Sequence, residues 1–423
     1  MEKECVNENQ RENTGALILI FLGWLVYSIS YLGKVNYSAN ITHIIDFYGV
    51  TKAQAGTVPT FFFFAYGIGQ VVNGLFCKKY NIKWIVFLSL FLSACINLII
   101  AFSTNFAVIK WLWLVNGFAL SILWPTLVRM LSEALPQKRL GTSSVVMGTT
   151  VATGTLIIYA LSSVFAAFNK FMLSFYTAGF AMLIVSAVWL LLYKKAFSAA
   201  KKEKDAESAD NKTVTDNAVK PEDTTGANRI FFATICVMCL FAIGVNLIKD
   251  GLTTWVPSIL KEEFSLSDSL SILLTLFLPI LAVFGNMSAL KMHKMIPDYI
   301  NHCTVVFAII AAFIVVIIGS LNFGAVVFML IGLVVVNYLA SSLNSLITSI
   351  FPLFMRGKVN SGLFAGVLNG FCYVGSTISS YGLGTIADNF GWSYVFLTLL
   401  GFCVLAFIVW CVYTIVTKGR KTV

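Results

Sequence analysis

The chain has 423 residues, of which 58% are apolar and only 11% charged, and its mean hydropathy is +0.85. These values exclude a soluble globular domain and predict an integral membrane protein. Its apolar runs reach the roughly 20 residues that a helix needs to cross a bilayer, and the short alternation typical of strands is missing from the sequence. We therefore expect an all-α membrane protein rather than a barrel.

Twelve membrane spans are expected along the chain. Hydrophilic residues 1–15 lead into the first span without a cleavage site of small residues, so we expect no removed signal peptide. The first and seventh spans are the longest and the most polar. The twelve cover residues 16–45, 56–77, 84–103, 107–131, 144–166, 171–193, 230–259, 268–292, 301–321, 323–350, 361–384 and 390–416.

The basic residues between the spans predict the orientation. If the N-terminus is cytosolic, 23 of the 29 Lys and Arg residues fall on the cytosolic side and four on the other. The positive-inside rule then describes a multi-pass protein of the cell membrane with both termini in the cytoplasm. The net charge of +10 is thus a topology signal, and no nucleic-acid partner is expected. The two remaining lysines lie within spans.

A polar interval at residues 194–229 divides the chain into halves of six spans each. It carries eight basic and seven acidic side chains, which is typical of a mobile cytosolic linker. Each half opens with a long polar span containing one lysine and has a basic turn after its second and fourth spans. We expect a six-helix bundle at 1–193, a linker at 194–229 and a second, pseudo-symmetric six-helix bundle at 230–423.

The two lysines within spans, Lys34 and Lys249, are the strongest candidates for a binding site. A lysine at bilayer depth costs about 2.5–3.5 kcal/mol on insertion scales, which its surroundings must offset. One explanation is snorkelling, in which the ammonium reaches the outer headgroups. Polar neighbours favour the other, a water-lined cavity that binds a small anionic substrate. These neighbours are Tyr27, Tyr31, Asn36 and Tyr37 in the first span and Asn246, Asp250, Thr253 and Thr254 in the seventh.

The acidic side chains within the spans indicate how transport could be coupled to protons or to a second anion. Asp250 is the one acid well inside a span, so it is the candidate for proton coupling or for a salt bridge with Lys249. Exchange of one anion for another is the simpler scheme, because importing a divalent ester alone costs about 2.3 kcal/mol per charge for each 100 mV. A returning phosphate cancels most of that cost. The sequence carries no nucleotide loop, metal cluster or hydrolytic triad, so we expect neither an enzyme nor a cofactor.

Four motifs follow one another over essentially the whole chain. The stretch NGFALSILWPTLVRMLSEALPQKRLGTSSVV, residues 116–146, joins a Gly-rich helix to a Trp-Pro pair, an arginine and a basic turn. It is similar to the fourth-helix signature of the organophosphate:phosphate antiporter family in the major facilitator superfamily. YLGKVNYS resembles that family's first-helix motif, LIKDGLTTWVPSILKEE its seventh helix, and ADNFGWSYVF its turn between the last two helices.

The resemblance implies a rocker-switch carrier that imports a phosphorylated organic anion, of sugar phosphate or glycerophosphate type, in exchange for inorganic phosphate. It places the two basic residues that clamp the phosphoryl group at Lys34 and Lys249. Further candidates for substrate binding are Tyr27, Tyr31, Tyr338, Tyr373, Gln70, Asn246 and Trp124. Candidates for the cytosolic gating loops are Lys78, Lys79, Arg129 and Arg139. No metal site is implied, and we expect a monomer.

The chain also departs from this family. Both clamp positions are arginine in the glycerol-3-phosphate and hexose-phosphate carriers, whereas lysine is a compact point charge without the planar fork of arginine. Val35, Gln70 and Val151 replace polar or basic residues of the glycerol-3-phosphate carrier, and Lys78 replaces the acid of the inner-gate motif. We therefore expect a different anion specificity and an altered charge lock at the inner gate.

Two other functions remain open on the sequence. A pair of lysines would also suit a carrier of carboxylates or sugar acids. The same family contains a membrane receptor for external sugar phosphate, so a sensor that binds without transporting is the second alternative.

Overall fold

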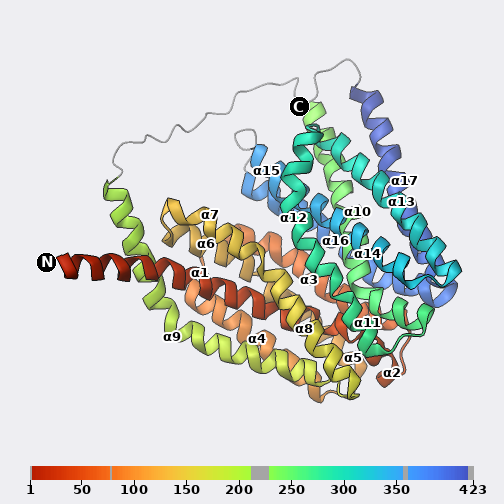
Figure 1. Ribbon diagram of the computed structural model, residues 1–423, viewed down its shortest axis with the longest axis horizontal. Coiled ribbons are helices and arrows are strands. Elements are labelled where there is room, and N and C mark those ends of the chain that lie inside the picture. The colour runs from red at the N-terminus through yellow and green to blue at the C-terminus, as the bar shows by residue number, and fades with distance from the viewer. Residues whose placement is uncertain (1, 77–78, 211–227, 356–360, 418–423) are drawn as a thin grey trace.

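The computed structural model describes residues 2–76, 79–210, 228–355 and 361–417 (Figure 1). Within these ranges the chain is almost entirely helical and contains no strand. In the described part of the chain, eleven helical segments are long and apolar enough to cross a membrane. The remaining predicted span, the eleventh at residues 361–384, corresponds to α16 (Ser361–Phe390), whose many serine, threonine and asparagine residues lower its hydropathy. The expected all-α membrane fold with twelve spans is confirmed.

The helices fall into two groups, one from each half of the chain. The first group comprises α1 (Glu2–Ala39), α2 (Ile41–Tyr48), α3 (Lys52–Phe76), α4 (Ile82–Phe102), α5 (Phe106–Ser121), α6 (Leu123–Ala134), α7 (Gln137–Gly148), α8 (Thr150–Ala167) and α9 (Leu173–Asp210). The second comprises α10 (Asn228–Phe264), α11 (Asp268–Thr275), α12 (Phe277–Met295), α13 (Tyr299–Phe323), α14 (Val326–Ser345), α15 (Phe351–Phe354), α16 and α17 (Trp392–Thr417). A π-helical turn, Leu346–Ile350, joins α14 to α15.

Several predicted spans are broken within the membrane, and two of the breaks have the same cause. The fourth span breaks at Ile122 and the eighth at Leu276, each three residues before a proline, Pro125 or Pro279. Proline lacks an N–H and its ring clashes with the carbonyl four residues earlier, which interrupts the helix there. The first span ends at Asn40, whose side-chain amide donates to the carbonyl of Asn36 (2.8 Å) and so competes with the helical backbone.

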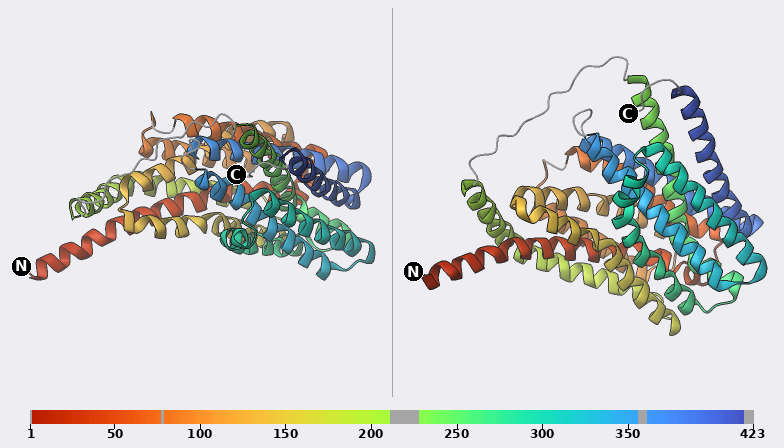
Figure 2. Two further views of the ribbon diagram at one scale, coloured as in Figure 1. Left: turned by 90° about the horizontal axis from the view of Figure 1, so that it is seen from above. Right: turned by 45° about the horizontal axis from the view of Figure 1, so that its top comes forward.

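The two groups of helices form a V (Figure 1). They meet at the end that carries α2 and α11, called here the α2 end. They diverge toward the opposite end, where α9 finishes and α10 begins, called here the linker end. The main contacts between the groups are α3 against α16 and α8 against α11. Figure 2 shows the two groups from two other directions, with the first turns of α1 extending beyond the bundle.

The α9 helix continues beyond the predicted span as far as Asp210. The first part of the predicted linker, residues 194–210, is therefore helical, whereas residues 211–227 lie outside the described part of the chain. This extension packs against the first bundle. Its Glu203 lies 3.6 Å from Arg139, and its Lys204 donates to the carbonyls of Ser132 (2.8 Å) and Glu133 (3.1 Å). Its charged side chains thus contact the last turn of α6 and the first turn of α7.

Candidate functional site

A cavity of about 260 Å³ lies between the two groups of helices. Helices α1, α3, α5, α7 and α8 line it from one side, and α10, α12, α14 and α16 line it from the other. Lys34 of α1 and Lys249 of α10 both belong to this lining. Sites between repeats near the middle of the bilayer are where carriers built from two bundles bind their substrates.

Lys34 lies in an aromatic surrounding. Its Nζ is 3.5 Å from the hydroxyl of Tyr31, 4.2 Å from the ring centre of Tyr66 and 5.7 Å from that of Tyr373. The negative faces of these rings stabilise the ammonium without neutralising it. Among the residues that the structure describes, no carboxylate lies within ion-pair distance of Lys34. The ammonium therefore remains available to an anion.

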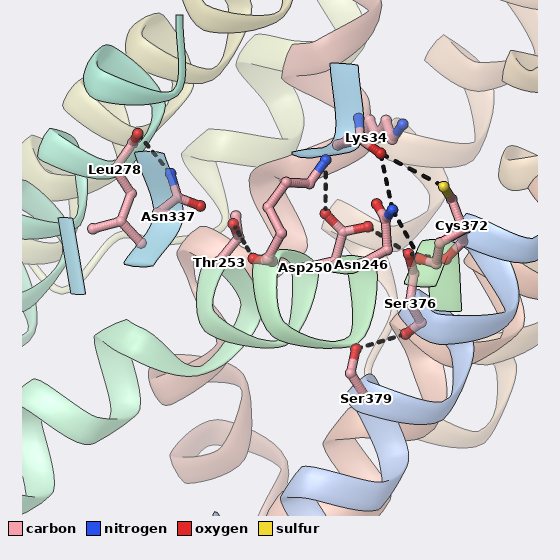
Figure 3. Close-up of polar contacts among 12 residues, drawn as sticks. Lys34, Asn246, Asp250, Thr253, Leu278, Asn337, Cys372, Ser376 and Ser379 are labelled. Atoms are coloured by element: carbon pink, nitrogen blue, oxygen red, sulfur yellow. Dashed lines mark hydrogen bonds and ion pairs between the residues drawn. The ribbon is translucent and has the colours of Figure 1, made fainter. Parts of the chain in front are cut away.

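Lys249 differs from Lys34 in having an acidic partner. Its Nζ lies 3.5 Å from the carboxylate of Asp250, and the other oxygen of that carboxylate accepts a hydrogen bond from Ser376 of α16 (Figure 3). This contact is the salt bridge that the sequence left open as one role of Asp250, and it makes the two lysines unequal. Of the charged residues that line the cavity within the described chain, Lys34, Lys249 and Asp250, the formal sum is +1.

The structure brings some predicted substrate-binding residues together and leaves others aside. Tyr31, Tyr373 and Asn246 line the cavity with the two lysines. Tyr27 is buried behind them, against the rings of Tyr31 and Trp124.

Three more of the predicted residues bond elsewhere or pack behind the cavity. Tyr338 donates to the hydroxyl of Ser288 (2.7 Å), and Gln70 donates to the carbonyl of Ser121 (3.0 Å). Trp124 packs against Tyr27. None of these three belongs to the described lining.

Three of the four predicted gating residues, Lys79, Arg129 and Arg139, lie at the linker end of the first bundle. Arg129 donates to the carboxylate of Glu133 (2.6 Å) and to the carbonyl of Tyr80 (3.0 Å), which ties α6 to the loop after α3. Arg139 contacts Glu203 of the α9 extension, as described above. Lys79 lies over the ring of Phe76 (5.2 Å). Lys78 lies outside the described residues.

An amide-rich wall is the feature that the sequence did not reveal. Five asparagines line the cavity, and all of them belong to the second bundle: Asn246, Asn286, Asn337, Asn344 and Asn369. The amide of Asn246 donates to Asn344 (2.9 Å). The amide of Asn337 donates to the carbonyl of Leu278 (2.8 Å; Figure 3). The buried Oδ1 of Asn337 has no described partner.

The opposite wall is aromatic. Tyr31, Phe62, Phe63 and Trp113 of the first bundle face the cavity with Lys34. The cavity thus combines a cation, aromatic rings and amides that can exchange hydrogen bonds with hydroxyl groups. The five asparagines are spread over four helices, with two of them on α14, so the amide wall becomes apparent only when these helices are assembled.

The cavity is closed toward the α2 end by ion pairs between the bundles. Lys52 at the start of α3 lies 3.1 Å from Glu262 and 3.8 Å from Asp388. Asp388 also accepts hydrogen bonds from the backbone amides of Lys52 (3.1 Å) and Ala53 (2.7 Å), so a side chain of α16 caps the N-terminus of α3.

A second set of ion pairs lies beside the first at the α2 end. Lys261 bridges Asp46 of α2 (2.7 Å) and Asp268 of α11 (3.0 Å). These contacts join the bundles at the α2 end, while the bundles diverge at the linker end (Figure 1). Breaking them and closing the other end would expose the cavity on the opposite side.

Comparison with known proteins agrees with this architecture. Residues 23–365 match the family model described as Major Facilitator Superfamily. The chain is 20% identical over 427 residues to a protein of Chlamydia trachomatis named Probable hexose phosphate transport protein, which covers 92% of this chain and 88% of that protein. It is 25% identical over 109 residues to the Membrane sensor protein UhpC of Salmonella typhimurium. That shorter match covers 26% of this chain and spans about a quarter (25%) of the sensor's length.

Similar solved structures show the same fold. A bacterial homolog of the human lysosomal transporter Spinster, in an inward-facing and occupied conformation, superposes with a TM-score of 0.73 at 12% identity and covers 96% of this chain and 98% of that one. A POT family transporter in complex with 5-aminolevulinic acid gives a TM-score of 0.74 at 14% identity, with 95% and 96% covered. At these identities the likeness concerns the fold alone.

Proposed function

Because the chain belongs to the Major Facilitator Superfamily, we propose that it imports a phosphorylated organic anion in exchange for inorganic phosphate by alternating access. The observation that carries this proposal is the uncompensated ammonium of Lys34 in a cavity between the bundles. A cation held away from bulk water is costly unless an anion joins it. Among the described residues no carboxylate lies within ion-pair distance of Lys34, so the substrate is the natural partner.

The walls of the cavity favour a hydroxylated carbon skeleton on that anion. The amides of the second bundle can donate to and accept from hydroxyl groups, and the aromatic rings of the first bundle can pack against C–H groups. We therefore favour a sugar phosphate or glycerophosphate. The 20% identical relative named as a probable hexose phosphate transport protein supports this substrate class.

The closed α2 end fits one half of an exchange cycle. In our proposal the linker end faces the cytosol, in accordance with the positive-inside rule, so the structure represents the inward-facing state of a monomer in the cell membrane. Substrate binding between Lys34 and the second bundle would draw the two bundles together at the linker end. The ion pairs of Lys52 and Lys261 would then break as the α2 end opens.

A second candidate function is that of a sensor. The chain is 25% identical over 109 residues to a protein named as a membrane sensor, and a sensor needs the same cavity without appreciable flux. A carrier of carboxylates or sugar acids remains a third candidate, because Lys34 would also suit a carboxylate.

Exchange in proteoliposomes distinguishes these functions. The purified chain is reconstituted into vesicles loaded with radiolabelled phosphate, and efflux is measured when sugar phosphates, glycerophosphate, carboxylates or sugar acids are added outside. We expect efflux with organophosphates and with phosphate itself. Efflux with carboxylates alone would exclude phosphate exchange, and binding of an organophosphate without efflux would identify a sensor.

A further inference from the structure

Asp250 places a carboxylate in a cavity that we expect to bind an anion. Its side chain is 17% exposed and belongs to the cavity lining. A carboxylate is only an acceptor of hydrogen bonds, with room for about four donors on its two oxygens. Lys249 approaches one oxygen and Ser376 donates to the other, so acceptor capacity remains toward the cavity (Figure 3).

The groups around Asp250 are well defined. Lys249 of the same helix is its ion-pair partner, and Lys34 of α1 is close enough to interact with it electrostatically. From α16, Ser376 donates to it, and Cys372 and Tyr373 lie nearby. No second carboxylate belongs to the cavity lining within the described chain.

We propose that the cavity accepts only oxyanions that still carry a proton, because that proton forms the hydrogen bond to Asp250. The inference rests on the transport function proposed above and specifies the ionic form of its substrate. A fully deprotonated oxyanion has only lone pairs to present to the carboxylate, so the two groups repel each other. An anion with an O–H group replaces this repulsion with a charge-assisted hydrogen bond.

The charge of the cavity favours the same substrates. The lining residues sum to +1, so a monoanion makes the loaded cavity neutral, whereas a dianion leaves it negative. An excess charge at bilayer depth is unfavourable. A phosphomonoester exists as a monoanion with one O–H below a pH of about 6, and inorganic phosphate retains at least one O–H at neutral pH. Sulfate retains none.

Two probes separate the role of the proton from that of the charge. Sulfate resembles phosphate in shape but has no proton. Dimethyl phosphate has a single negative charge, like the monoanion of a phosphomonoester, but no O–H group. If charge alone decided, dimethyl phosphate would bind as well as monomethyl phosphate. If the proton decides, monomethyl phosphate binds and dimethyl phosphate does not.

The test is inhibition of phosphate–phosphate exchange in proteoliposomes at pH 5.5 and 7.5. For the unmodified protein we expect sulfate and dimethyl phosphate to inhibit at least about tenfold more weakly than phosphate, because a site built around a hydrogen bond rejects analogues that cannot make it. We expect monomethyl phosphate to inhibit more strongly at the lower pH. Equal inhibition by sulfate or dimethyl phosphate would overturn this inference and leave phosphate exchange in place.

Asp250→Asn supplies the matched variant. The amide of asparagine can donate to a deprotonated oxyanion, so we expect sulfate to inhibit within about threefold of phosphate. Asp205→Asn removes an exposed carboxylate of the α9 extension, outside the cavity, and should keep the discrimination of the unmodified protein. If Asp250→Asn does not fold, inhibition of the unmodified protein by sulfate and dimethyl phosphate still tests the inference. Absence of any phosphate exchange in that protein would instead reject the transport function, and this inference with it.

Discussion

The Nζ of Lys52 lies 3.1 Å from the carboxylate of Glu262, and this ion pair joins the two bundles at the α2 end. The indole N–H of Trp392 also donates to Glu262 (2.9 Å), which holds the carboxylate in place. The side chains of Lys52 and Glu262 are 20% and 38% exposed. Because solvent screens a pair of this kind, its contribution to closure is modest, and the closed end can open during transport.

We predict that Glu262→Gln shifts the protein toward the state that is open at the α2 end. An ion pair at such exposure contributes up to about 1 kcal/mol, so the ratio of open to closed protein should rise about twofold to fivefold. Ser163 lies buried in the contact of α8 with α11, so Ser163→Cys provides a reporter. The rate at which a polar maleimide labels this cysteine measures the opening.

A control variant and the dependence of labelling on salt test this interpretation. Glu263→Gln removes the neighbouring carboxylate, which makes no ion pair within the described chain and acts on Lys52 only at longer range, so it should change the labelling rate much less. Salt at about 1 M should accelerate labelling of the unmodified protein more than that of Glu262→Gln, because it screens a pair that the variant lacks. An equal rate in Glu262→Gln and in the unmodified background would show that the pair does not hold the end closed.

Substitution of Lys34 should affect binding of every anion. We expect Lys34→Ala to weaken phosphate binding by about tenfold to a hundredfold, since a hydrogen bond to a charged group contributes about 1.5–3 kcal/mol. Lys34→Arg should retain binding, because the guanidinium keeps the charge beside Tyr31 and Tyr66. Isothermal titration with phosphate in detergent measures both. Lys110→Ala is the control, since Lys110 lies over the ring of Trp111 outside the cavity. Unchanged affinity in Lys34→Ala would rule out an anion site at this residue.

The amide wall should discriminate between substrates by their carbon skeleton. Asn344 accepts from Asn246 and lines the cavity, so Asn344→Leu removes a polar group without changing charge. We expect the KM for a sugar phosphate to rise about tenfold while phosphate–phosphate exchange changes little, because inorganic phosphate has no skeleton to contact that wall. Asn389→Leu, at the end of α16, is the control. An equal loss for both substrates would assign Asn344 to the phosphate site or to folding.

Composition predicted most of the fold. All twelve spans were predicted from hydrophobic length. Eleven of them are apolar enough in the described chain to cross a membrane, and the other, the eleventh span or α16, was predicted although its polar residues lower its hydropathy. Helix breaks at Ile122 and Leu276 were not anticipated, although Pro125 and Pro279 mark them in the sequence. A span prediction integrates hydropathy over about 20 residues and is insensitive to a local interruption.

Composition did not predict that residues 194–210 form the α9 extension, and the reason is different. Residues 194–210 are as charged as a disordered linker, but their helix continues α9 and contacts partners that are distant in sequence. Glu203 meets Arg139, and Lys204 meets the carbonyl of Ser132. These tertiary contacts add to the helical propensity of the Ala, Lys and Glu residues in the segment.

The site was partly predictable. A lysine within a span is costly enough to indicate a cavity, and both Lys34 and Lys249 line one. Whether an adjacent acid neutralises a lysine depends on rotamers, so the pairing of Lys249 with Asp250 was left open as one of two roles for that acid. Tyr338 was assigned to the cavity through a resemblance, but its hydroxyl bonds to Ser288 instead.

Protonation of His43 should weaken the α2 end. His43 of α2 stacks on Phe171 (5.6 Å), its Nε2 lies 3.6 Å from Asp268, and its buried Nδ1 has no described partner. Burial lowers the pKa of His43 below 6.5, and this effect outweighs the attraction of Asp268 and Asp46 for the charged ring. The positive charge of Lys261 also lowers the pKa of His43.

The lowered pKa of His43 determines how the stability of the protein changes with pH. A histidine whose pKa is lowered in the folded protein binds fewer protons there than in the unfolded chain, so stability falls as the pH drops below about 6.5. We expect the Tm of the purified protein to fall between pH 7.5 and 5.5 by about 1–2 °C more than that of His43→Gln. Parallel Tm profiles for the two proteins would mean that His43 is equally protonated in the folded and unfolded states. The carboxylates of the α2 end are the same in both proteins, so the difference between the profiles isolates the imidazole.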